Sequence, residues 1–178
     1  GTPEVLFPVA CRAEALPAPT APTGPDASAL VERLRYDDAI AWSPDGTKIA
    51  FRGGDCESVY DNCLSVGTIA TGTERALAAF GGGGADDGYA VVPAWRPDGA
   101  RLAWTAYSGD TVHVQEAAAD GSGGRRVGTA QDRELTYVDP GRALVTAQYQ
   151  GRSRIMLVDL ATGRRTPLMQ GSQPAVRP

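Results

Sequence analysis

AWSPDGTKIAF at residues 41–51 and AWRPDGARLAW at residues 94–104 are two copies of one motif. Both copies keep the Ala-Trp pair, the Pro-Asp-Gly triplet and a second Ala at the same spacing. Pro fixes φ, Asp hydrogen-bonds the nearby backbone and Gly accepts a positive φ, so the triplet predicts a tight turn. Short segments that alternate apolar and polar residues flank the turn, as β-strands do. Each copy therefore predicts a β-hairpin.

A third, degraded copy, VDPGRALVT, occupies residues 138–146, and a second shared segment follows each copy. These segments are CLSVGTIATGTERAL (63–77), TVHVQEAAADGSGGRRV (111–127) and RIMLVDLATGRRTPL (154–168). Each combines an alternating strand, a Gly-bearing turn and a charged strand, which predicts another hairpin. Four antiparallel strands that recur at intervals of roughly 43 to 53 residues match the period of a β-propeller blade. The predicted fold class is all-β, a propeller with about three to four blades, each of four antiparallel strands.

The composition agrees with a single all-β domain. The chain has 178 residues, of which 42% are hydrophobic and 21% charged, so it can bury a core. Its 22 Gly and 13 Pro argue against a helical bundle and for short strands joined by turns. No apolar run approaches the roughly 20 residues of a membrane-spanning helix. The formal net charge of −4 argues against a surface that binds nucleic acid.

The AWSPDG…IAF and LVDLATG elements resemble the TolB-type, WD-like β-propeller repeat, and the resemblance covers residues 36–178 in three copies. It implies blades around a central channel and, most often, a protein- or ligand-binding scaffold in the bacterial envelope. Related propellers precede the catalytic domain in some serine peptidases, and a few act alone as lyases. These implications are analogies, because one fold can host many functions.

The repeats divide the chain into 36–90, 91–130 and 131–170, and residues 171–178 start or close a further blade. Residues 1–35 are expected to hold N-terminal strands and a Pro/Ala-rich linker. Three blades do not close a ring by themselves. The two ends of the chain could build a fourth blade together. Alternatively, the chain is a fragment of a larger propeller or a half-ring that dimerises.

The N-terminal strands are expected at Glu4–Ala10 and Leu30–Arg35, the second because later repeats have a strand at the equivalent place. A short helix capped by Asp26 or Ser28 is the alternative for the second segment. The role of Cys11 stays open.

Cys56 and Cys63 bracket a polar stretch, DCESVYDNC, between two predicted strands. A disulfide across the base of this loop is sterically easy. A metal site would need further ligands, and neither the single His nor the third Cys is near in sequence. A disulfide indicates an oxidising compartment, so we expect an extracytoplasmic protein that is secreted, periplasmic or attached to the envelope.

The repeat also assigns loops to the two faces of a propeller. The Pro-Asp-Gly turns fall on one face, and the loops between hairpins and between blades fall on the other, around the channel mouth. Acidic and tyrosine residues are frequent in these second loops, and loops on a rigid scaffold often carry function. We expect a binding face for a cationic ligand, a basic peptide or a sugar; the alternative is that the acids are merely solvated. The predicted ligand-binding residues are Tyr36, Asp37, Asp38, Asp86, Asp87, Tyr89, Tyr107, Asp132 and Tyr137.

The sequence predicts no catalytic residue and no metal ligand. It has no Gly-x-Ser-x-Gly nucleophile elbow, and its single His, His113, lies in the alternating strand TVHVQ, where a structural role is expected. Asp45 and Asp98 are explained by their turns. No cofactor is expected, although acids on the loop face supply the hard oxygen ligands that Ca²⁺ prefers.

The three tryptophans follow the repeat. Trp42 and Trp95 recur at one strand position, so we expect them to pack between blades. Trp104 matches Phe51 of the first copy and is expected in the core in the same way.

These observations favour a non-enzymatic extracytoplasmic scaffold that engages a protein or a small ligand through the acidic, Tyr-bearing face. One alternative is an enzyme, a carboxylate- or metal-dependent lyase or hydrolase. Another is the propeller accessory domain of a peptidase. A homodimer, or a place within a longer chain, is compatible with each of these. A carboxylate pair with a raised pKa at the channel would favour the enzyme.

Overall fold

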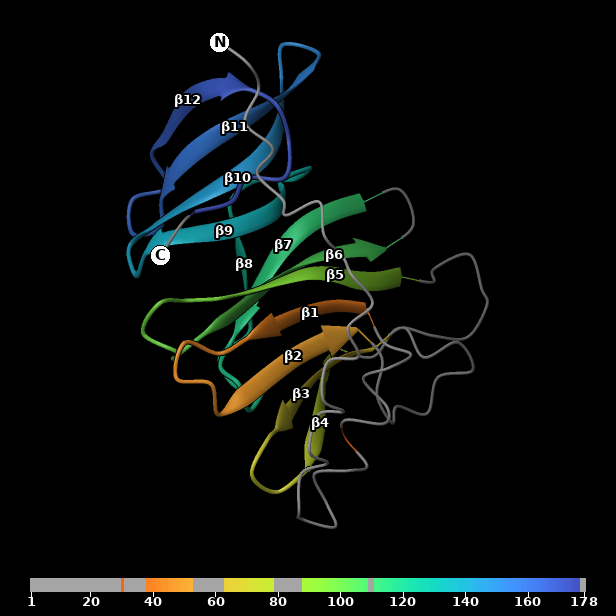
Figure 1. Ribbon diagram of the computed structural model, residues 1–178. Helices are drawn as coiled ribbons and strands as arrows, with labels where there is room; N and C mark the ends of the chain where they lie inside the picture. Colours follow the sequence, from red (N-terminus) through yellow and green to blue (C-terminus); the bar gives the residue numbers. More distant parts are fainter. Residues whose placement is uncertain (1–29, 31–37, 53–62, 79–87, 109–110, 177–178) are drawn as a thin grey trace, which may run out of the picture.

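The computed structural model describes residues 30, 38–52, 63–78, 88–108 and 111–176. They form three four-stranded antiparallel sheets, and in each sheet the strands lie side by side in chain order (Figure 1). The predicted all-β fold with four-stranded propeller blades is confirmed. The strands are β1 (Asp38–Trp42), β2 (Lys48–Arg52), β3 (Leu64–Thr68), β4 (Glu74–Ala78), β5 (Gly88–Trp95), β6 (Leu102–Ser108), β7 (Thr111–Ala117), β8 (Arg125–Val127), β9 (Arg133–Asp139), β10 (Arg142–Tyr149), β11 (Arg152–Asp159) and β12 (Arg165–Gln170).

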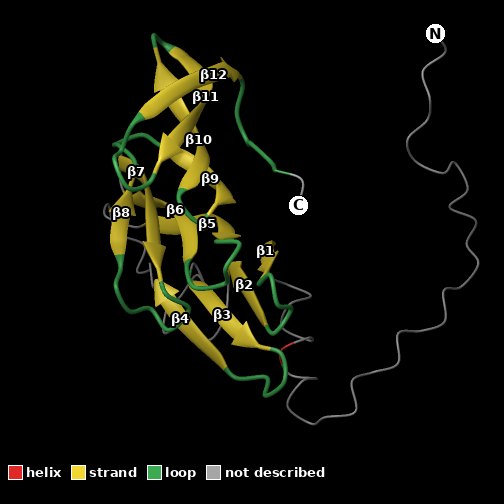
Figure 2. Cartoon of the chain, turned by 90° about the vertical axis from the view of Figure 1, so that its left-hand side faces the viewer, coloured by secondary structure: helices red, strands yellow, loops and turns green. Residues whose placement is uncertain are grey.

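We call the sheets blade 1 (β1–β4), blade 2 (β5–β8) and blade 3 (β9–β12). Blade 2 lies between the other two, and the strands described do not close a ring (Figures 1 and 2). The apolar core lies between the blades, since one buried cluster joins blades 1 and 2 and another joins blades 2 and 3. No helix within the described ranges is long and apolar enough to cross a membrane.

The Pro-Asp-Gly turns form as the sequence predicts. Gly46 has a φ of +69°, and the matching glycine of the second copy has the same value, which L side chains rarely adopt. Asp45 accepts a hydrogen bond from the amide two residues on at 3.1 Å, and Asp98 accepts the equivalent bond at 3.0 Å. Side-chain hydrogen bonds from Ser43 and Arg96, respectively, are the main reason that both carboxyl pKa values are lowered, that of Asp45 to about 2.

The first strand of each blade carries an aromatic residue near its end, and in blades 2 and 3 this residue contacts the preceding blade. Trp95 is only 8% exposed, and its indole nitrogen donates a hydrogen bond to the Ala41 carbonyl of blade 1 at 3.0 Å. Tyr137 holds the equivalent place in blade 3, is 5% exposed and bonds to blade 2. Trp42 holds it in blade 1 but is 58% exposed. The expected packing between blades is thus found for Trp95 and not for Trp42, because no described strand lies against the Trp42 side chain.

The strand expected at Leu30–Arg35 is not found at the one described residue of that segment. Leu30 has a helical backbone, in line with the alternative of a short helix. Its side chain is buried and packs on Ile49 and Phe51 of blade 1. Leu30 is therefore attached to blade 1 by packing of its side chain on the face of the sheet, and not by backbone pairing along the edge of the sheet. The strand expected at Glu4–Ala10 lies outside the described residues.

The C-terminal residues form no strand over 171–176. Gln173 nevertheless repeats the backbone of Glu134, with φ values of +53° and +55°. The Glu134 amide donates to the Thr105 hydroxyl of blade 2 at 2.7 Å, and the Gln173 amide donates to the Thr146 hydroxyl of blade 3 at 3.0 Å. The tail therefore meets blade 3 as β9 meets blade 2. That residues 171–178 start or close a further blade stays a prediction.

Candidate functional site

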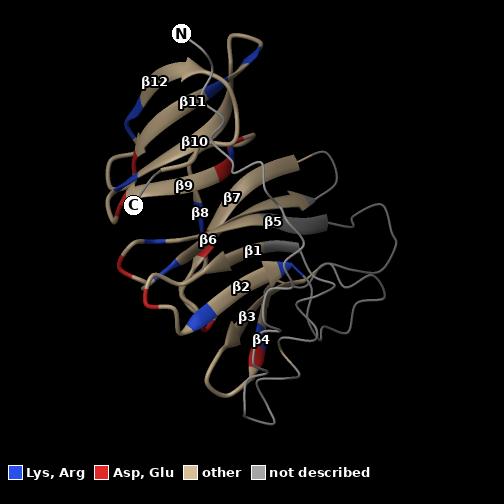
Figure 3. Cartoon of the chain, viewed as in Figure 1, with Lys and Arg blue, Asp and Glu red and all other residues tan. Residues whose placement is uncertain are grey.

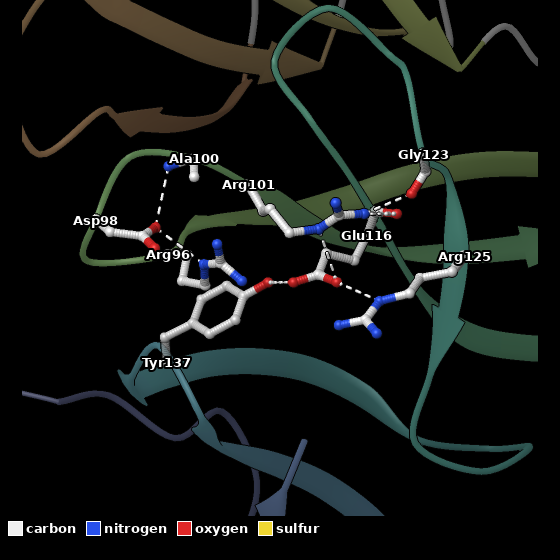
Figure 4. Close-up of polar contacts among 8 residues, drawn as sticks. All are labelled: Arg96, Asp98, Ala100, Arg101, Glu116, Gly123, Arg125 and Tyr137. Carbon is white, nitrogen blue, oxygen red and sulfur yellow. Dashed lines mark hydrogen bonds and ion pairs between the residues drawn. The ribbon is translucent and has the colours of Figure 1, made fainter. Parts of the chain in front are cut away.

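Glu116 lies at the centre of a buried polar cluster between blades 2 and 3 (Figure 4). Its side chain, on β7, is fully buried. The Tyr137 hydroxyl on β9 donates to Oε1 at 2.7 Å, and Arg125 Nε on β8 donates to Oε2 at 2.7 Å. Arg101 Nε lies 3.0 Å from the same Oε2. The cluster ties the outer hairpin of blade 2 to the inner strand of blade 3.

The pKa shifts in this cluster point away from acid–base chemistry. Burial raises the pKa of Glu116, but the hydrogen bonds from Tyr137 and Arg125 and the nearby guanidinium charges outweigh burial, and the pKa is lowered. Burial, followed by the bond to Glu116, raises the pKa of Tyr137. Near neutral pH, Glu116 therefore accepts hydrogen bonds without holding a proton, and Tyr137 keeps its proton. A general acid or base needs a pKa near the working pH, so the cluster serves as a link between blades.

Asp132 forms a second buried link, in the loop between β8 and β9. It is 1% exposed and binds Arg165 of β12 through both carboxylate oxygens. Bidentate pairs of this kind fix geometry as well as charge. The Thr129 amide also donates to Asp132, at 2.7 Å. Gly128 has a φ of +78°, and a Cβ at this position would clash with the Asp132 carboxylate.

The predicted ligand-binding residues are only partly covered by the structure. Asp38 and Tyr89 lie at the start of β1 and β5. The remaining loop residues of the prediction lie outside the described ranges, and these are Tyr36, Asp37, Asp86 and Asp87.

Three further residues of that prediction can be placed. Tyr107 of β6 is partly buried and pairs with Tyr89 of β5, so the structure brings these two positions together in blade 2. Asp132 and Tyr137, in contrast, are buried and bonded to protein groups, and they do not lie on an open loop face. Tyr137 was expected in a loop but lies within β9, which begins at Arg133. Figure 3 colours the charged residues along the backbone; among the described parts of the chain they lie at several turns and also within strands such as β4.

A cavity of about 460 Å³ opens between the outer strand of blade 1 and the outer half of blade 2. Its walls are mostly apolar, and four polar side chains reach it from blade 2. The lining includes Leu77 and Ala78 of β4, Trp104 and Ala106 of β6, His113 and Gln115 of β7, and Arg126 of β8.

Two buried nitrogen atoms of the residues lining this cavity have no hydrogen-bond partner in the described part of the chain: Trp104 Nε1 and His113 Nδ1. The side chains are 5% and 8% exposed. Gln115 Nε2 lies 2.9 Å from His113 Nε2. With the Gln115 amide in this orientation, its nitrogen donates to Nε2, and the neutral His113 ring carries its hydrogen on Nδ1. Burial, with a smaller contribution from the Arg126 charge, lowers the pKa of His113 and keeps the ring neutral at pH 7.

Sequence reasoning assigned Trp104 to the core and His113 to a structural role, and it missed the cavity. The signal was present in the strand alternation. Trp104 pairs with Gln115, and Ala106 pairs with His113, so all four side chains share one face of blade 2. What the sequence does not contain is the distance between that face and blade 1.

Cys63 is fully buried just before β3 and is disulfide-bonded. Its partner is not among the described residues, so pairing with Cys56 stays a prediction. Within the described ranges, no three His, Cys, Asp or Glu side chains form a group that could hold a metal ion.

No protein-family model matches the chain, and no curated protein matches its sequence. Solved structures match its fold. TolB from Acinetobacter baumannii superimposes with a TM-score of 0.57 at 22% identity, over 74% of this chain and 32% of that chain. The putative TolB from Agrobacterium tumefaciens gives 0.55 at 19% identity, over 74% and 50%. The fold is that of a TolB-like β-propeller.

A puromycin-hydrolyzing peptidase from Mycobacterium tuberculosis shares the fold as well, with a TM-score of 0.55 at 22% identity, over 76% of this chain and 22% of that chain. The chain thus spans half or less of the length of each of these proteins. Because propellers occur both in TolB and in an enzyme, the likeness supports a propeller scaffold and leaves its function open.

Proposed function

We propose that this chain is a non-enzymatic propeller module that acts outside the cytoplasm and binds a partner. The observation that carries the proposal is the cavity between blades 1 and 2, whose lining residues Trp104 and His113 each have a buried nitrogen without a partner. Buried polar groups are nearly always hydrogen-bonded, and leaving one unpaired costs about 1–3 kcal/mol. The two atoms themselves lie beneath the cavity surface, so the cavity carries the proposal through its mostly apolar walls and four polar side chains, the usual composition of a small-molecule site.

The buried carboxylates also favour binding over catalysis. Glu116 and Asp132 are both occupied by arginine and hydroxyl or amide donors. The pKa of Glu116 is lowered, whereas a carboxyl group that donates a proton near neutral pH needs a raised pKa. The acidic, Tyr-bearing face remains a second proposed contact surface, of which Asp38, Tyr89 and Tyr107 lie in described strands.

The disulfide at Cys63 supports an extracytoplasmic location, because disulfides persist in oxidising compartments and are rare in the cytosol. We propose Cys56 as its partner, because Cys56 and Cys63 bracket one polar loop between two strands and a disulfide across its base is sterically easy.

Ligand screening by saturation-transfer difference NMR tests the binding proposal. The screen uses small carboxylates, amines and sugars against the whole chain. We expect at least one class to bind, and binding to be lost in Ala78→Phe, where the ring fills the cavity. Ala76→Phe is the matched control, because Ala76 is exposed on the same strand and does not line the cavity.

Both variants are checked for native circular dichroism before the screen. Failure of every compound to bind the wild-type chain would contradict the proposal, and so would unchanged binding in a folded Ala78→Phe variant. The propeller part of a peptidase is a second candidate, favoured by the likeness to the puromycin-hydrolyzing peptidase. An accessory domain of that kind predicts an empty screen.

A further inference from the structure

We propose that the Leu30 side chain is a stopper, which takes the place of a preceding blade on blade 1 and keeps a second copy of the chain from packing there. When Leu30 is removed, blade 3 of a second copy packs on this face of blade 1. Blades 1 and 3 lie at the two ends of the row of blades, so the contact runs head to tail (Figure 1). This inference does not depend on the proposed binding function.

Leu30 lies over a glycine that the strand itself does not require. A Cβ at Gly67 would lie 2.9 Å from Leu30 Cδ2 and 3.0 Å from Cδ1, closer than ordinary contacts, so a larger residue here would push the leucine away. Gly67 lies within β3, and its φ is not positive. A glycine inside a strand weakens the strand and often marks a place where another group approaches closely. The space needed by Leu30, and not the backbone, therefore accounts for this glycine.

The other two blades show what this position holds when a blade lies against it. Strand pairing makes Ala117 of blade 2 and Val158 of blade 3 the equivalents of Gly67. Ala117 and Val158 are each 2% exposed and belong to the apolar clusters between blades. Among the three described blades, the glycine thus occurs in the one whose face meets Leu30 in place of a blade.

Leu30 covers only part of this surface, which we call the front face of blade 1. It packs on Ile49 and Phe51, which are 2% and 0% exposed. Trp42 pairs with Ile49 across the sheet and therefore shares the face, but it is 58% exposed. Without Leu30, the three large apolar side chains of Trp42, Ile49 and Phe51 would form one open surface. Continuous apolar surfaces of this kind mark sites of protein association.

The surface that fits the front face lies at the other end of the row, on the side of blade 3 that faces away from blade 2. In blade 2, the corresponding side packs against blade 3 through Ala103, Thr105, Val114, Glu116 and Val127. Strand pairing gives the equivalent positions of blade 3, which we call its back face, as Leu144, Thr146, Ile155, Leu157 and Met169. Four of these five are apolar, and Met169 is 60% exposed. The back face therefore repeats a surface that already receives a blade.

One position of the back face selects a blade that carries a tryptophan. At the junction of blades 2 and 3, the receiving residue is Glu116, and it binds a tyrosine hydroxyl. At the junction of blades 1 and 2, the equivalent residue is Val66, and it lies in one apolar cluster with Trp95. Blade 3 holds the apolar Leu157 at this position. Trp42 of a second copy is an exposed tryptophan at the matching place, so we infer a second copy as the occupant.

The C-terminal residues now lie where β1 of that copy would enter. The Gln173 amide donates to the Thr146 hydroxyl at 3.0 Å and to the Glu134 carboxylate at 2.9 Å. The side chains of Gln173, Ala175 and Val176 are exposed, so hydrogen bonds of the backbone, rather than apolar burial, hold this segment. An incoming strand can replace them with its own amide, as the Glu134 amide does at the Thr105 hydroxyl of blade 2.

Sedimentation velocity on the full chain tests the inference. Gly67→Val introduces the residue that blade 3 holds at this position and displaces Leu30. We expect the wild-type chain to be monomeric and the Gly67→Val variant to show at least a twofold higher mass at the same protein concentration. Gly124→Val is the matched control, because no atom lies within 4 Å of a Cβ at Gly124 and its φ is not positive. This control should stay monomeric.

Two second substitutions in the Gly67→Val chain locate the contact. Trp42→Ala damages the front face and Leu157→Glu damages the back face, so each double variant should be monomeric. A mixture of the two double variants still contains one intact front face and one intact back face. We therefore expect the mixture to form a one-to-one dimer, because a head-to-tail contact joins different surfaces. A contact between two front faces would be lost in the same mixture.

Several outcomes would overturn the inference. A folded Gly67→Val variant that stays monomeric would do so, and so would a wild-type chain that already associates to the same extent. Association that survives Leu157→Glu, or a mixture that stays monomeric, would overturn the head-to-tail contact. Leu30→Ala replaces Gly67→Val if the latter does not fold. In the wild-type chain, nuclear Overhauser effects should connect the Leu30 methyl groups to the Phe51 ring, and their absence would overturn the stopper without any variant.

Discussion

Replacing Trp42 and Trp95 separately tests what determines how much each tryptophan stabilises the chain. We argue that packing against a neighbouring blade determines it, and not the sequence motif. Trp42 and Trp95 occupy the same place in two copies of one sequence motif. Trp95 is 8% exposed and donates a hydrogen bond to Ala41, whereas Trp42 is 58% exposed. We expect Trp95→Ala to destabilise the chain strongly and Trp42→Ala to have a small effect.

The magnitudes follow from the buried areas. A fully buried aromatic side chain removes about 150–250 Å² from water, and at about 25 cal/mol/Å² this is worth roughly 4–6 kcal/mol as an upper value. Measured Trp→Ala losses in cores are about 3–5 kcal/mol, which we expect for Trp95. Trp42 keeps more than half of its surface in water, so the same arithmetic gives about 2 kcal/mol as an upper value, and we expect about 1 kcal/mol.

Urea unfolding followed by far-UV circular dichroism measures both losses. The free energies of unfolding are compared only where their slope against urea concentration is the same, since a changed slope would mean a changed unfolded or native state. Each titration is run at two protein concentrations, so that any association through the exposed Trp42 surface would show as a shifted midpoint.

Equal losses at the two positions, independent of concentration, would refute the argument. They would mean that Trp42 is buried in the folded chain, or that Trp95 contributes little to the contact between blades 1 and 2. A loss at Trp42 that grows with protein concentration would instead assign its burial to a second molecule.

Two further predictions concern the buried links of blade 3. The pKa of Glu116 is lowered in the folded chain, so its stabilising contribution is fully present above its ordinary value of 4.5 and is lost as the pH falls through the lowered pKa. Urea midpoints measured from neutral to acidic pH should fall in that range, and less steeply in Glu116→Gln; parallel curves would contradict this. Gly128→Ala should cost about 3 kcal/mol or more in urea unfolding, because its Cβ displaces the Asp132 carboxylate from Arg165. Gly151→Ala, with φ +72° and open space around it, should cost only about 1–2 kcal/mol, and equal losses would show that the ion pair is not disturbed.

The repeat units could be predicted from sequence because their determinants are local. A Pro-Asp-Gly turn and its flanking strands lie within a dozen residues, and the structure forms the turns at Asp45 and Asp98 as expected. The blades follow because neighbouring strands in each sheet are consecutive in the chain.

The contacts between blades could not be predicted in the same way. Asp132 binds an arginine 33 residues away, and Tyr137 binds a glutamate 21 residues away. In the sequence, Asp132 and Tyr137 therefore looked like an acid and a tyrosine of a polar loop. Their burial depends on how two sheets face each other, and no strand pattern encodes this. Trp42 shows the converse. Its motif shares the Ala-Trp pair and the Pro-Asp-Gly turn with that of Trp95, yet the Trp42 side chain stays exposed because no described blade covers it.

The two blade junctions differ in how their buried polar groups are paired, and the difference decides where an uncompensated cost remains. Between blades 2 and 3, the buried oxygens of Glu116 and Asp132 are met by donors from both blades. Between blades 1 and 2, Trp95 finds an acceptor, but the nitrogens of Trp104 and His113 do not. Arg101 Nε, at the junction of blades 2 and 3, also lacks a hydrogen bond, but it lies in an ion pair with Glu116 at 3.0 Å. Each unmet donor costs about 1–3 kcal/mol. The uncompensated cost therefore falls at the junction of blades 1 and 2, beside the cavity for which we propose a ligand.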